Sequence, residues 1–520
     1  MVANNDRVWI FDTTLRDGDQ ALSASLSQAE KVQVAHAIAR LNVDVMEVGF
    51  PVSSPGDFAA VSQIAREVKG PVICGLARAV AKDIEACGEA LKDAENRRIH
   101  IFIATSPIHL QNKLKMSLSK ANDMAVAAIK LASRYTDDIE FSCEDAARTP
   151  YEDLNWIIER VIDAGATTIN IPDTVGYTTP MEYAKLVRNL MDNVPNIDKA
   201  RISVHGHNDL GLAVANSIAA VAEGARQIEC TINGIGERAG NCAMEEVAMI
   251  LATRKDLFNL HTQLNCKEIY RTSRLVSQVC NMPIQANKAI VGQNAFAHSS
   301  GIHQDGMLKA SNTYEIMSPD SIGKHKTELN LTSRSGRHVI KNRLETLGYG
   351  EDEYDLENIY AAFVKLADQK GQVQDYDLEA LLHFSTLDEQ TGHKYQVDFV
   401  NIHSNSSSIA SATVALLIDG EQVIESATGN GAVDAAFHAI HKITDKDIKI
   451  TEYHLDAKGS GADALGEVNV VAEYNSRKFH GAGLATDIVE SSVRAFVHVL
   501  NLCETARKIE DIKQENLGGI

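Results

Sequence analysis

The chain has 520 residues, more than one ordinary domain needs, and its length predicts roughly two to four domains. Hydrophobic residues make up 44% and charged residues 23%, the proportions of a soluble globular protein. The formal net charge of −20 argues against a general nucleic-acid binder, because such proteins carry a basic surface, but a local basic cluster could still hold a phosphate-bearing ligand.

The N-terminal segment MVANNDRVWIFD has no basic stretch followed by an apolar run, so we expect no signal peptide. No stretch approaches the roughly 20 apolar residues of a membrane helix, so we expect no membrane contact. The eight cysteines are scattered without a C-x-x-C pair, which indicates neither a disulfide framework nor a thiolate zinc site. We therefore expect a cytoplasmic protein.

The first half alternates short apolar or β-branched runs with amphipathic helical patterns, at steps of roughly 30 residues that are typical of strand–helix units. The strand candidates are 8–12, 43–49, 72–76, 99–104, 139–143, 168–171, 202–205 and 228–232. Helical patterns with apolar residues three and four apart lie between them, as in 28–41, 122–134 and 154–164. Eight units in succession predict an α/β fold, a (β/α)₈ barrel. A doubly wound open sheet is the alternative, although the first strand lacks a following G-x-G-x-x-G.

Polar residues gather at or just after the C-terminal ends of these strand candidates. They are Asp12, Glu47, Arg78, Glu144, Asp173, His205 and Asn233. In such barrels the strand–helix loops converge on this face, where the chemistry takes place. Any one of these residues alone could be structural, but together they predict a site at this end of the barrel.

Between about residues 275 and 384 the strand–helix rhythm is lost. A polar segment at 297–306 precedes helical patterns at 339–347 and 356–367. The stretch is too apolar to be disordered, so we interpret it as one or two small connecting subdomains.

After about residue 391 an internal βββα repeat follows. Strand-like runs at 395–402, 410–418 and 422–427 precede a helix near 432–443, and runs at 448–456, 467–474 and 477–480 precede a helix near 486–500. A glycine pair stands before each helix, Gly429 with Gly431 and Gly481 with Gly483. Such glycines either turn backbone N–H groups toward an anion at the helix start or simply make tight turns. The repeat indicates an α+β binding or regulatory module.

A candidate metal site combines three strands that a closed barrel makes neighbours. His205 and His207 lie two residues apart at the end of the seventh strand, so both imidazoles project to one face. Asp12 ends the first strand, and Asn241 lies in a glycine-rich loop after the eighth. This mixed nitrogen and oxygen set suits an octahedral Mn²⁺, Mg²⁺ or Co²⁺ ion better than a closed structural zinc site. The alternatives are structural histidines, or an H-x-H barrel hydrolase, in which the pair normally follows the first strand.

The motifs resemble those of the DRE-TIM metallolyases, a superfamily of (β/α)₈-barrel enzymes. Its two signatures are similar to DTTLRDGD at 12–19 and HGHND at 205–209, while GIGERAGN at 234–241 and SGIHQD at 300–305 narrow the match to the alkylmalate-forming branch. From residue 8 to about 499 the chain is most similar to the long bacterial form of the 2-isopropylmalate synthase family. Asp19 stands where Glu is common and Gly206 where Thr or Pro is common, but neither is expected to be a metal ligand.

The resemblance implies condensation of acetyl-CoA with 3-methyl-2-oxobutanoate, thioester hydrolysis to 2-isopropylmalate, and feedback inhibition of leucine biosynthesis by L-leucine. It implies a divalent cation, Mn²⁺ first and Mg²⁺, Co²⁺ or Zn²⁺ as alternatives, with K⁺ as a further candidate activator. It divides the chain into a catalytic barrel at 1–274, connecting subdomains at 275–390 that contribute to the active site, and a leucine-binding domain at 391–520. Leucine would bind near the glycine pairs.

The resemblance also assigns roles to single residues. Arg16 would bind the oxygens of the 2-oxo acid and stabilise the alkoxide that forms. Glu144 matches a catalytic glutamate of the family, and His303 and Tyr314 match residues that serve in deprotonation of acetyl-CoA or in hydrolysis of the thioester. His303 and Tyr314 would come from the partner subunit of a domain-exchanged homodimer. The 2-oxo acid pocket would be lined by His100, Ser142, Thr174 and Glu237.

Three other functions stay open at this point. Citramalate or homocitrate synthase differs only in the 2-oxo acid, and one methylene changes binding by only about 1–3 kcal/mol. A retro-Claisen lyase of the HMG-CoA lyase type would release acetyl-CoA or acetate instead of consuming acetyl-CoA. A non-enzymatic amino-acid sensor would need no metal ligands at the barrel mouth.

Overall fold

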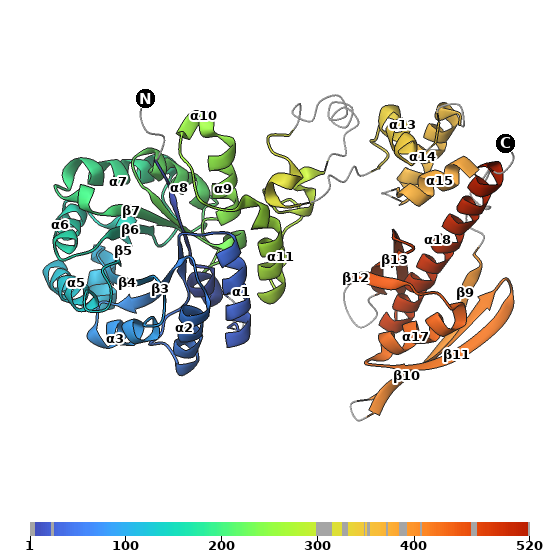
Figure 1. The fold of residues 1–520 in the computed structure, drawn as a ribbon, viewed down its shortest axis with the longest axis horizontal. Helices are drawn as coiled ribbons and strands as arrows, with labels where there is room; N and C mark the ends of the chain where they lie inside the picture. The colour runs from blue at the N-terminus through green and yellow to red at the C-terminus, as the bar shows by residue number, and fades with distance from the viewer. Residues whose placement is uncertain are drawn as a thin grey trace. The chain divides into compact units, whose positions relative to one another are not determined.

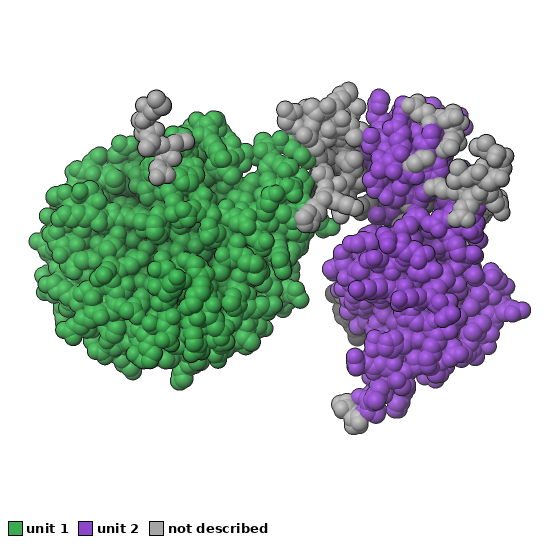
Figure 2. Space-filling view, in the orientation of Figure 1, with its two compact units in different colours: residues 1–298, 310–328 green, residues 299–309, 329–520 purple. Residues whose placement is uncertain are grey.

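The computed structural model describes residues 6–21, 25–297, 315–324, 331–347, 349–350, 354–370, 373–383, 393–405, 408–458 and 465–517. The described residues form two compact units, one within 1–298 and 310–328 and the other within 329–520 (Figure 2). Among the described residues no helix has the length and apolar character needed to cross a membrane.

The first unit is a closed barrel of eight parallel strands in sequential order (Figure 1). The strands are β1 (Trp9–Asp12), β2 (Val45–Glu47), β3 (Val72–Arg78), β4 (Arg97–Ala104), β5 (Ile139–Glu144), β6 (Thr168–Asp173), β7 (Arg201–Gly206) and β8 (Gln227–Cys230). The predicted barrel is confirmed, with each strand within a few residues of its expected place. The open-sheet alternative is wrong because β1 pairs with β8, where Ile10 lies opposite Ile228.

Helices surround the barrel, and several of them begin at a side-chain cap. The helices are α1 (Gln28–Arg40), α2 (Pro55–Glu67), α3 (Ala81–Ala90), α4 (Pro107–His109), α5 (Leu118–Ala132), α6 (Tyr151–Asp163), α7 (Pro180–Asn193), α8 (Ala213–Ala222), α9 (Met244–Thr253), α10 (Lys255–Phe258) and α11 (Ile269–Val279). Helix α1 begins at a capping box, in which Ser27 and Glu30 bond each other's backbone N–H groups. Its buried face, which includes Val34 and Ile38, belongs to the core shared with the strands.

A buried polar network fills the barrel interior near the N-terminal ends of the strands. The Arg98 guanidinium donates to Glu140 at 2.8 Å and to Gln227 at 2.9 Å. Gln227 in turn donates to Glu140 at 2.8 Å and to Ser203 at 2.9 Å. Because these groups bond one another, they can be buried without leaving unpaired charge.

The second unit contains a helical subdomain with its own core. Its helices are α13 (Arg337–Thr346), α14 (Leu356–Lys370) and α15 (Asp375–His383). The first two confirm the helical patterns expected at 339–347 and 356–367. Ile340, Leu344, Phe363 and Leu378 are fully buried in a cluster separate from that of the barrel.

The rest of the second unit confirms the βββα repeat. The first half contains β9 (Tyr395–Asn405), β10 (Ser408–Ile418), β11 (Glu421–Gly429) and α17 (Ala432–Thr444), and the second contains β12 (Lys449–Lys458), β13 (Leu465–Tyr474), β14 (Arg477–Ala485) and α18 (Ile488–Leu517). The sheets have the orders β11-β10-β9 and β12-β13-β14, so the second strand of each half is central. One core joins the halves, with the rings of Phe437 on α17 and Phe496 on α18 stacked 4.8 Å apart.

The two glycine pairs occupy different positions, which corrects one prediction. Gly429 ends β11 and Gly431 is the N-cap residue of α17, as expected. Gly481 and Gly483 instead lie inside β14, which continues to Ala485 before α18 begins. A Cβ atom at either position would collide with a backbone carbonyl oxygen of α18. These two glycines therefore allow close packing of strand and helix, and they do not form a helix start.

Candidate metal centre and substrate pocket

Three buried side chains meet at the C-terminal end of the barrel. Asp17, His205 and His207 each offer one ligand atom, and these atoms lie within 4.8 Å of one another. The Nε2 atoms of the two histidines are 3.1 Å apart, because residues two apart at the end of β7 project to the same face. Each of the three residues is at most 5% exposed. Their arrangement can hold a cation.

Asp12, the expected acidic ligand, is not in this group. Its carboxylate accepts hydrogen bonds from the backbone N–H of Thr14 at 3.1 Å and from the Thr14 hydroxyl at 2.8 Å. Those bonds fix the start of the helical turn η1 (Thr14–Gly18), which carries Asp17 toward the histidines. The structure therefore corrects the prediction. The strand-end aspartate shapes the turn, and the second aspartate of the same motif faces the histidines.

Asn241 reaches this group from the loop after β8, as its sequence predicts. Its amide nitrogen donates to Asp17 Oδ1 at 2.7 Å, and its backbone pairs with that of His207. Gly236 has no Cβ atom, and a Cβ there would overlap the Asn241 amide. The Asn241 amide oxygen is buried and has no hydrogen-bond partner among the described residues. A buried acceptor of this kind normally has a partner, so it fits a further cation ligand.

The electrostatics of the group also fit a divalent cation. Burial and the neighbouring His205 lower the pKa of His207 to about 3, so this imidazole is neutral. Burial opposes ionisation of Asp17, but Arg16 and His205 outweigh it and hold the pKa of the carboxyl well below its usual range. Burial lowers the pKa of His205, but Glu229 and Asp17 outweigh it and raise that pKa. Metal binding requires neutral imidazoles and an ionised carboxylate, so a cation competes with a proton at His205. The set of two nitrogen and two oxygen donors matches an open octahedral site.

A chain of hydrogen bonds extends from this group across the barrel mouth. Arg16 donates through Nε to Glu47 at 2.5 Å, and the other Glu47 oxygen lies 2.7 Å from His100 Nδ1. His100 Nε2 lies 2.7 Å from the Ser142 hydroxyl, which also accepts from Asn170 at 2.8 Å. The predicted proximity of Arg16, His100 and Ser142 is thus found. The sequence indicates Glu47 only as one of several strand-end residues, and Asn170 lies inside β6, where no sequence signal marks it.

The middle of this chain is a buried ion pair. Burial raises the pKa of Glu47, but Arg16 and His100 outweigh it and hold that pKa at about 2. Burial lowers the pKa of His100, but Glu47 outweighs it and raises that pKa to about 8. The Arg16 guanidinium also donates through Nη1 to Asp17 at 2.7 Å. Its orientation is therefore fixed from two sides.

The remaining predicted residues lie around this centre with other partners. Glu144 ends β5, and its carboxylate accepts from Lys113 at 2.5 Å. Thr174 follows β6, and its hydroxyl accepts from the backbone N–H of Asp145 at 3.0 Å. The Glu237 side chain is 63% exposed, and only its backbone N–H approaches Asp17, at 3.4 Å. His303 and Tyr314 lie outside the described residues.

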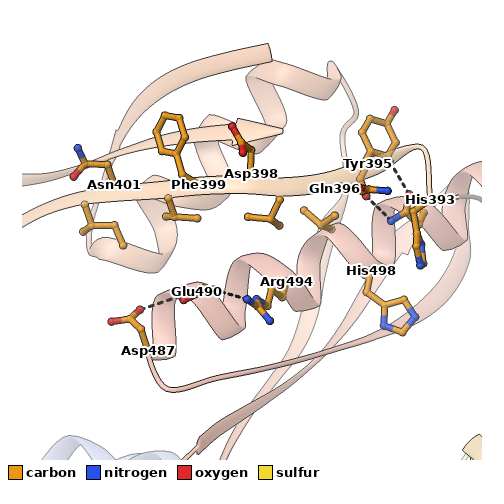
Figure 3. Close-up of a pocket in the computed structure, with 15 residues that line it drawn as sticks. His393, Tyr395, Gln396, Asp398, Phe399, Asn401, Asp487, Glu490, Arg494 and His498 are labelled. Carbon is orange, nitrogen blue, oxygen red and sulfur yellow. Dashed lines mark hydrogen bonds and ion pairs between the residues drawn. The ribbon is translucent and has the colours of Figure 1, made fainter. Parts of the chain in front are cut away.

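The C-terminal repeat contains two cavities in corresponding places. One of about 800 Å³ lies between β9 and the first half of α18, with Tyr395, Phe399 and Arg494 on its walls (Figure 3). The other, of about 640 Å³, lies between α17 and β12 and is lined by Gly431, Phe437 and other residues. In each case the edge strand of one half faces the helix of the other half.

Family comparisons cover nearly the whole chain. The family described as HMGL-like matches residues 7–276, and the homocitrate synthase post-HMGL domain-like family matches residues 290–371. The LeuA allosteric (dimerisation) domain matches residues 372–503. Among solved structures, a hydroxymethylglutaryl-CoA lyase from Pseudomonas aeruginosa is 20% identical and covers 59% of this chain and 99% of its own, with a TM-score of 0.46.

Curated relatives match over nearly their full length. The 2-isopropylmalate synthase of Pseudoalteromonas atlantica is 62% identical over 98% of both chains. That of Shewanella frigidimarina is 60% identical over 99% of this chain and 100% of its own. By this identity, coverage and domain order, the chain belongs to the 2-isopropylmalate synthase family.

Proposed function

We propose that this chain condenses acetyl-CoA with 3-methyl-2-oxobutanoate and hydrolyses the thioester, giving 2-isopropylmalate and CoA, the first committed step of leucine biosynthesis. The observation that carries the proposal is the buried group of Asp17, His205 and His207 beside the Arg16 guanidinium. This group lies in a chain that is 62% identical to a 2-isopropylmalate synthase, and that identity supports this reaction over the alternatives.

Asp17, His205, His207 and the amide oxygen of Asn241 would hold the divalent cation, with Mn²⁺ proposed first and Mg²⁺, Co²⁺ or Zn²⁺ as alternatives. Such an ion, when bound, polarises the ketone of a 2-oxo acid as a Lewis acid. Activation by K⁺ stays a prediction.

The protein's own groups would bind and orient the 2-oxo acid. Glu47 and Asp17 fix the Arg16 guanidinium, so it can stabilise the alkoxide that forms on the former ketone oxygen without reorganising. His100 and Ser142, already bonded to each other, are proposed to supply further polar contacts to the acid. Thr174 and Glu237 are proposed contacts at the rim.

A base must remove a proton from the weakly acidic methyl group of acetyl-CoA while the new carbon–carbon bond forms. We assign this step to Glu144, whose carboxylate must first release Lys113 to accept the proton. Water then attacks the thioester carbonyl, and the CoA thiolate leaves and takes up a proton. His303 and Tyr314 are proposed to assist these proton transfers from the partner subunit.

The test is release of free thiol from acetyl-CoA in the presence of Mn²⁺, with 3-methyl-2-oxobutanoate, pyruvate and 2-oxoglutarate compared. Fast release with the first substrate alone is expected. Preference for pyruvate or 2-oxoglutarate would instead indicate citramalate or homocitrate synthase. Absence of release with all three would favour a lyase or a sensor and end the condensation proposal.

L-Leucine is the proposed effector, and the cavity beside Gly431 is its proposed site. The cavity combines a helix start, which favours a carboxylate, with apolar walls that include Phe437, Ile448 and Ile450. Gly431→Asp should relieve leucine inhibition while activity remains, because no atom lies within 4 Å of a Cβ at this position. Gly56→Asp, near the start of α2 in the barrel, is the matched control and should leave inhibition unchanged. Unchanged inhibition in Gly431→Asp would place leucine elsewhere.

A homodimer with shared active sites is also proposed. Mixing His303→Ala chains with Glu144→Ala chains should restore part of the activity, because mixed dimers then contain one intact site. Strictly additive residual rates would contradict a site shared between subunits.

A further inference from the structure

Behind the metal centre lies a buried carboxylate to which the proposed reaction gives no role. Glu229 on β8 is directly opposite His205 on β7 in the strand register, so both side chains point into the barrel. Its Oε2 atom is 2.7 Å from His205 Nδ1. Glu229 is 1% exposed and does not belong to the Asp17, His205 and His207 group.

This contact determines which nitrogen of His205 can bind a cation. A carboxylate accepts the Nδ1 proton, and the lone pair of the imidazole is then on Nε2. Nε2 is the nitrogen that faces the metal centre, 3.1 Å from His207 Nε2. Without a partner at Nδ1, the ring could rotate or adopt the other tautomer, and the Nε2 donor would be lost for part of the time.

A comparison within the centre supports a specific role. Both Nδ1 atoms are buried, but that of His205 lies 2.7 Å from the Glu229 carboxylate, whereas that of His207 faces no carboxylate within ion-pair distance among the described residues. The backbone of His207 is instead held by Asn241. The two histidines are therefore positioned differently, His207 through its backbone and His205 through its ring. The backbone of His205 is also held, since Tyr183 donates to its carbonyl oxygen at 3.3 Å.

We propose that Glu229 is the positioning residue of the metal centre: it accepts the Nδ1–H of His205 and holds that ring with Nε2 directed at the cation. This inference rests on the proposed metal centre but not on the identity of the 2-oxo acid. Carboxylate partners of this kind fix the ligand ring and make it a stronger donor, and their loss typically weakens metal binding about 10- to 100-fold.

The experiment measures Mn²⁺ affinity of the metal-free, full-length protein by the electron paramagnetic resonance signal of free Mn²⁺. Glu229→Ala should raise the Kd for Mn²⁺ by about 10- to 100-fold, whereas Glu229→Gln, whose amide oxygen can still accept the proton, should restore most of the affinity. His205→Ala serves as the reference for a lost ligand. Glu140→Gln is the matched control, because Glu140 is equally buried in the same barrel but bonds Arg98 and Gln227.

A folded Glu229→Ala protein with the wild-type Kd would overturn the inference, and so would an equal rise in Kd for Glu140→Gln. If the alanine variant does not fold, Glu229→Asp replaces it; its shorter side chain withdraws the carboxylate, so an unchanged Kd there would also overturn the inference. Wild-type protein that binds Mn²⁺ but releases no thiol would end the condensation proposal and leave the role of Glu229 intact. Unchanged Mn²⁺ affinity in His205→Ala would overturn both the metal centre and the inference.

Discussion

The two ends of the barrel interior both contain buried polar networks, but their unpaired groups differ. Near the N-terminal ends of the strands a neutral hydroxyl, that of Thr168, is buried without a partner among the described residues, whereas at the C-terminal ends possible metal donors are. Near the N-terminal ends of the strands, Arg98, Glu140 and Gln227 bond one another. At the C-terminal ends, the Asn241 amide oxygen and the His207 Nδ1 atom are buried without hydrogen-bond partners among the described residues.

The difference separates a structural network from a binding one. Mutually bonded groups compensate the cost of their own burial and leave little capacity for a ligand. Groups that leave donors or acceptors unpaired carry an energetic cost, which a bound cation or substrate can offset. The contrast predicts that substitutions at the two ends will have different consequences, activity at one and stability at the other.

The largest expected effect is at Asp17. Asp17→Asn should lower thiol release on the order of 10³-fold and weaken Mn²⁺ binding, because loss of a charged ligand removes several kcal/mol of transition-state stabilisation. Asp12→Asn is the comparison, and it should lower Mn²⁺ affinity far less, since Asp12 bonds Thr14. Equal losses in both variants would contradict the assignment of Asp17 as the ligand.

At the opposite end, Arg98→Met should affect stability. It leaves Glu140 buried without its cationic partner, so the free energy of unfolding should fall by about 3–5 kcal/mol. Urea unfolding followed by circular dichroism measures the change. The neighbouring Arg97→Met is the control and should change stability by less than about 0.5 kcal/mol, because Arg97 bonds only a backbone carbonyl at the surface among its described contacts. A stable Arg98→Met protein would show that the network is not structural.

A serine-to-alanine substitution at each end of the barrel tests the same contrast between a binding and a structural network. Ser142→Ala removes the partner of both His100 and Asn170, so the KM for the 2-oxo acid should rise about 10-fold. Ser203→Ala removes a bond to Gln227 at the other end and should leave that KM unchanged. Steady-state kinetics at saturating acetyl-CoA measures both. A higher KM in the Ser203 variant would mean that the two ends are coupled.

The last comparison concerns the glycines of the C-terminal repeat, away from the barrel. Gly483→Ala should destabilise this domain by about 1–3 kcal/mol, because the added methyl meets the backbone of α18. Gly431→Ala should change the free energy of unfolding by less than about 0.5 kcal/mol, since the space around it is open. Differential scanning calorimetry of the full chain distinguishes them. Equal destabilisation would mean that both pairs serve packing.

Local pattern by itself determined the barrel and the repeat. The strands and helices carry their own periodicity, and because a parallel barrel buries its strands on both faces, their apolar and β-branched residues mark them even where polar residues interrupt the run. The spacing of His205 and His207 and the glycine-rich loop before Asn241 likewise indicated three residues of the candidate metal centre, because both features are local in the chain. The family resemblance added the neighbourhood of Arg16, His100 and Ser142.

Only the tertiary structure decided which of two aspartates meets the histidines, which pair of glycines begins a helix, and which carboxylate lies behind His205. The turn after β1 carries Asp17, and not Asp12, toward the imidazoles. β14 continues past Gly481 and Gly483 because α18 packs against it. Glu229 meets His205 because two strands stand in one register. These contacts join segments that are remote in the chain, so local sequence periodicity does not predict them.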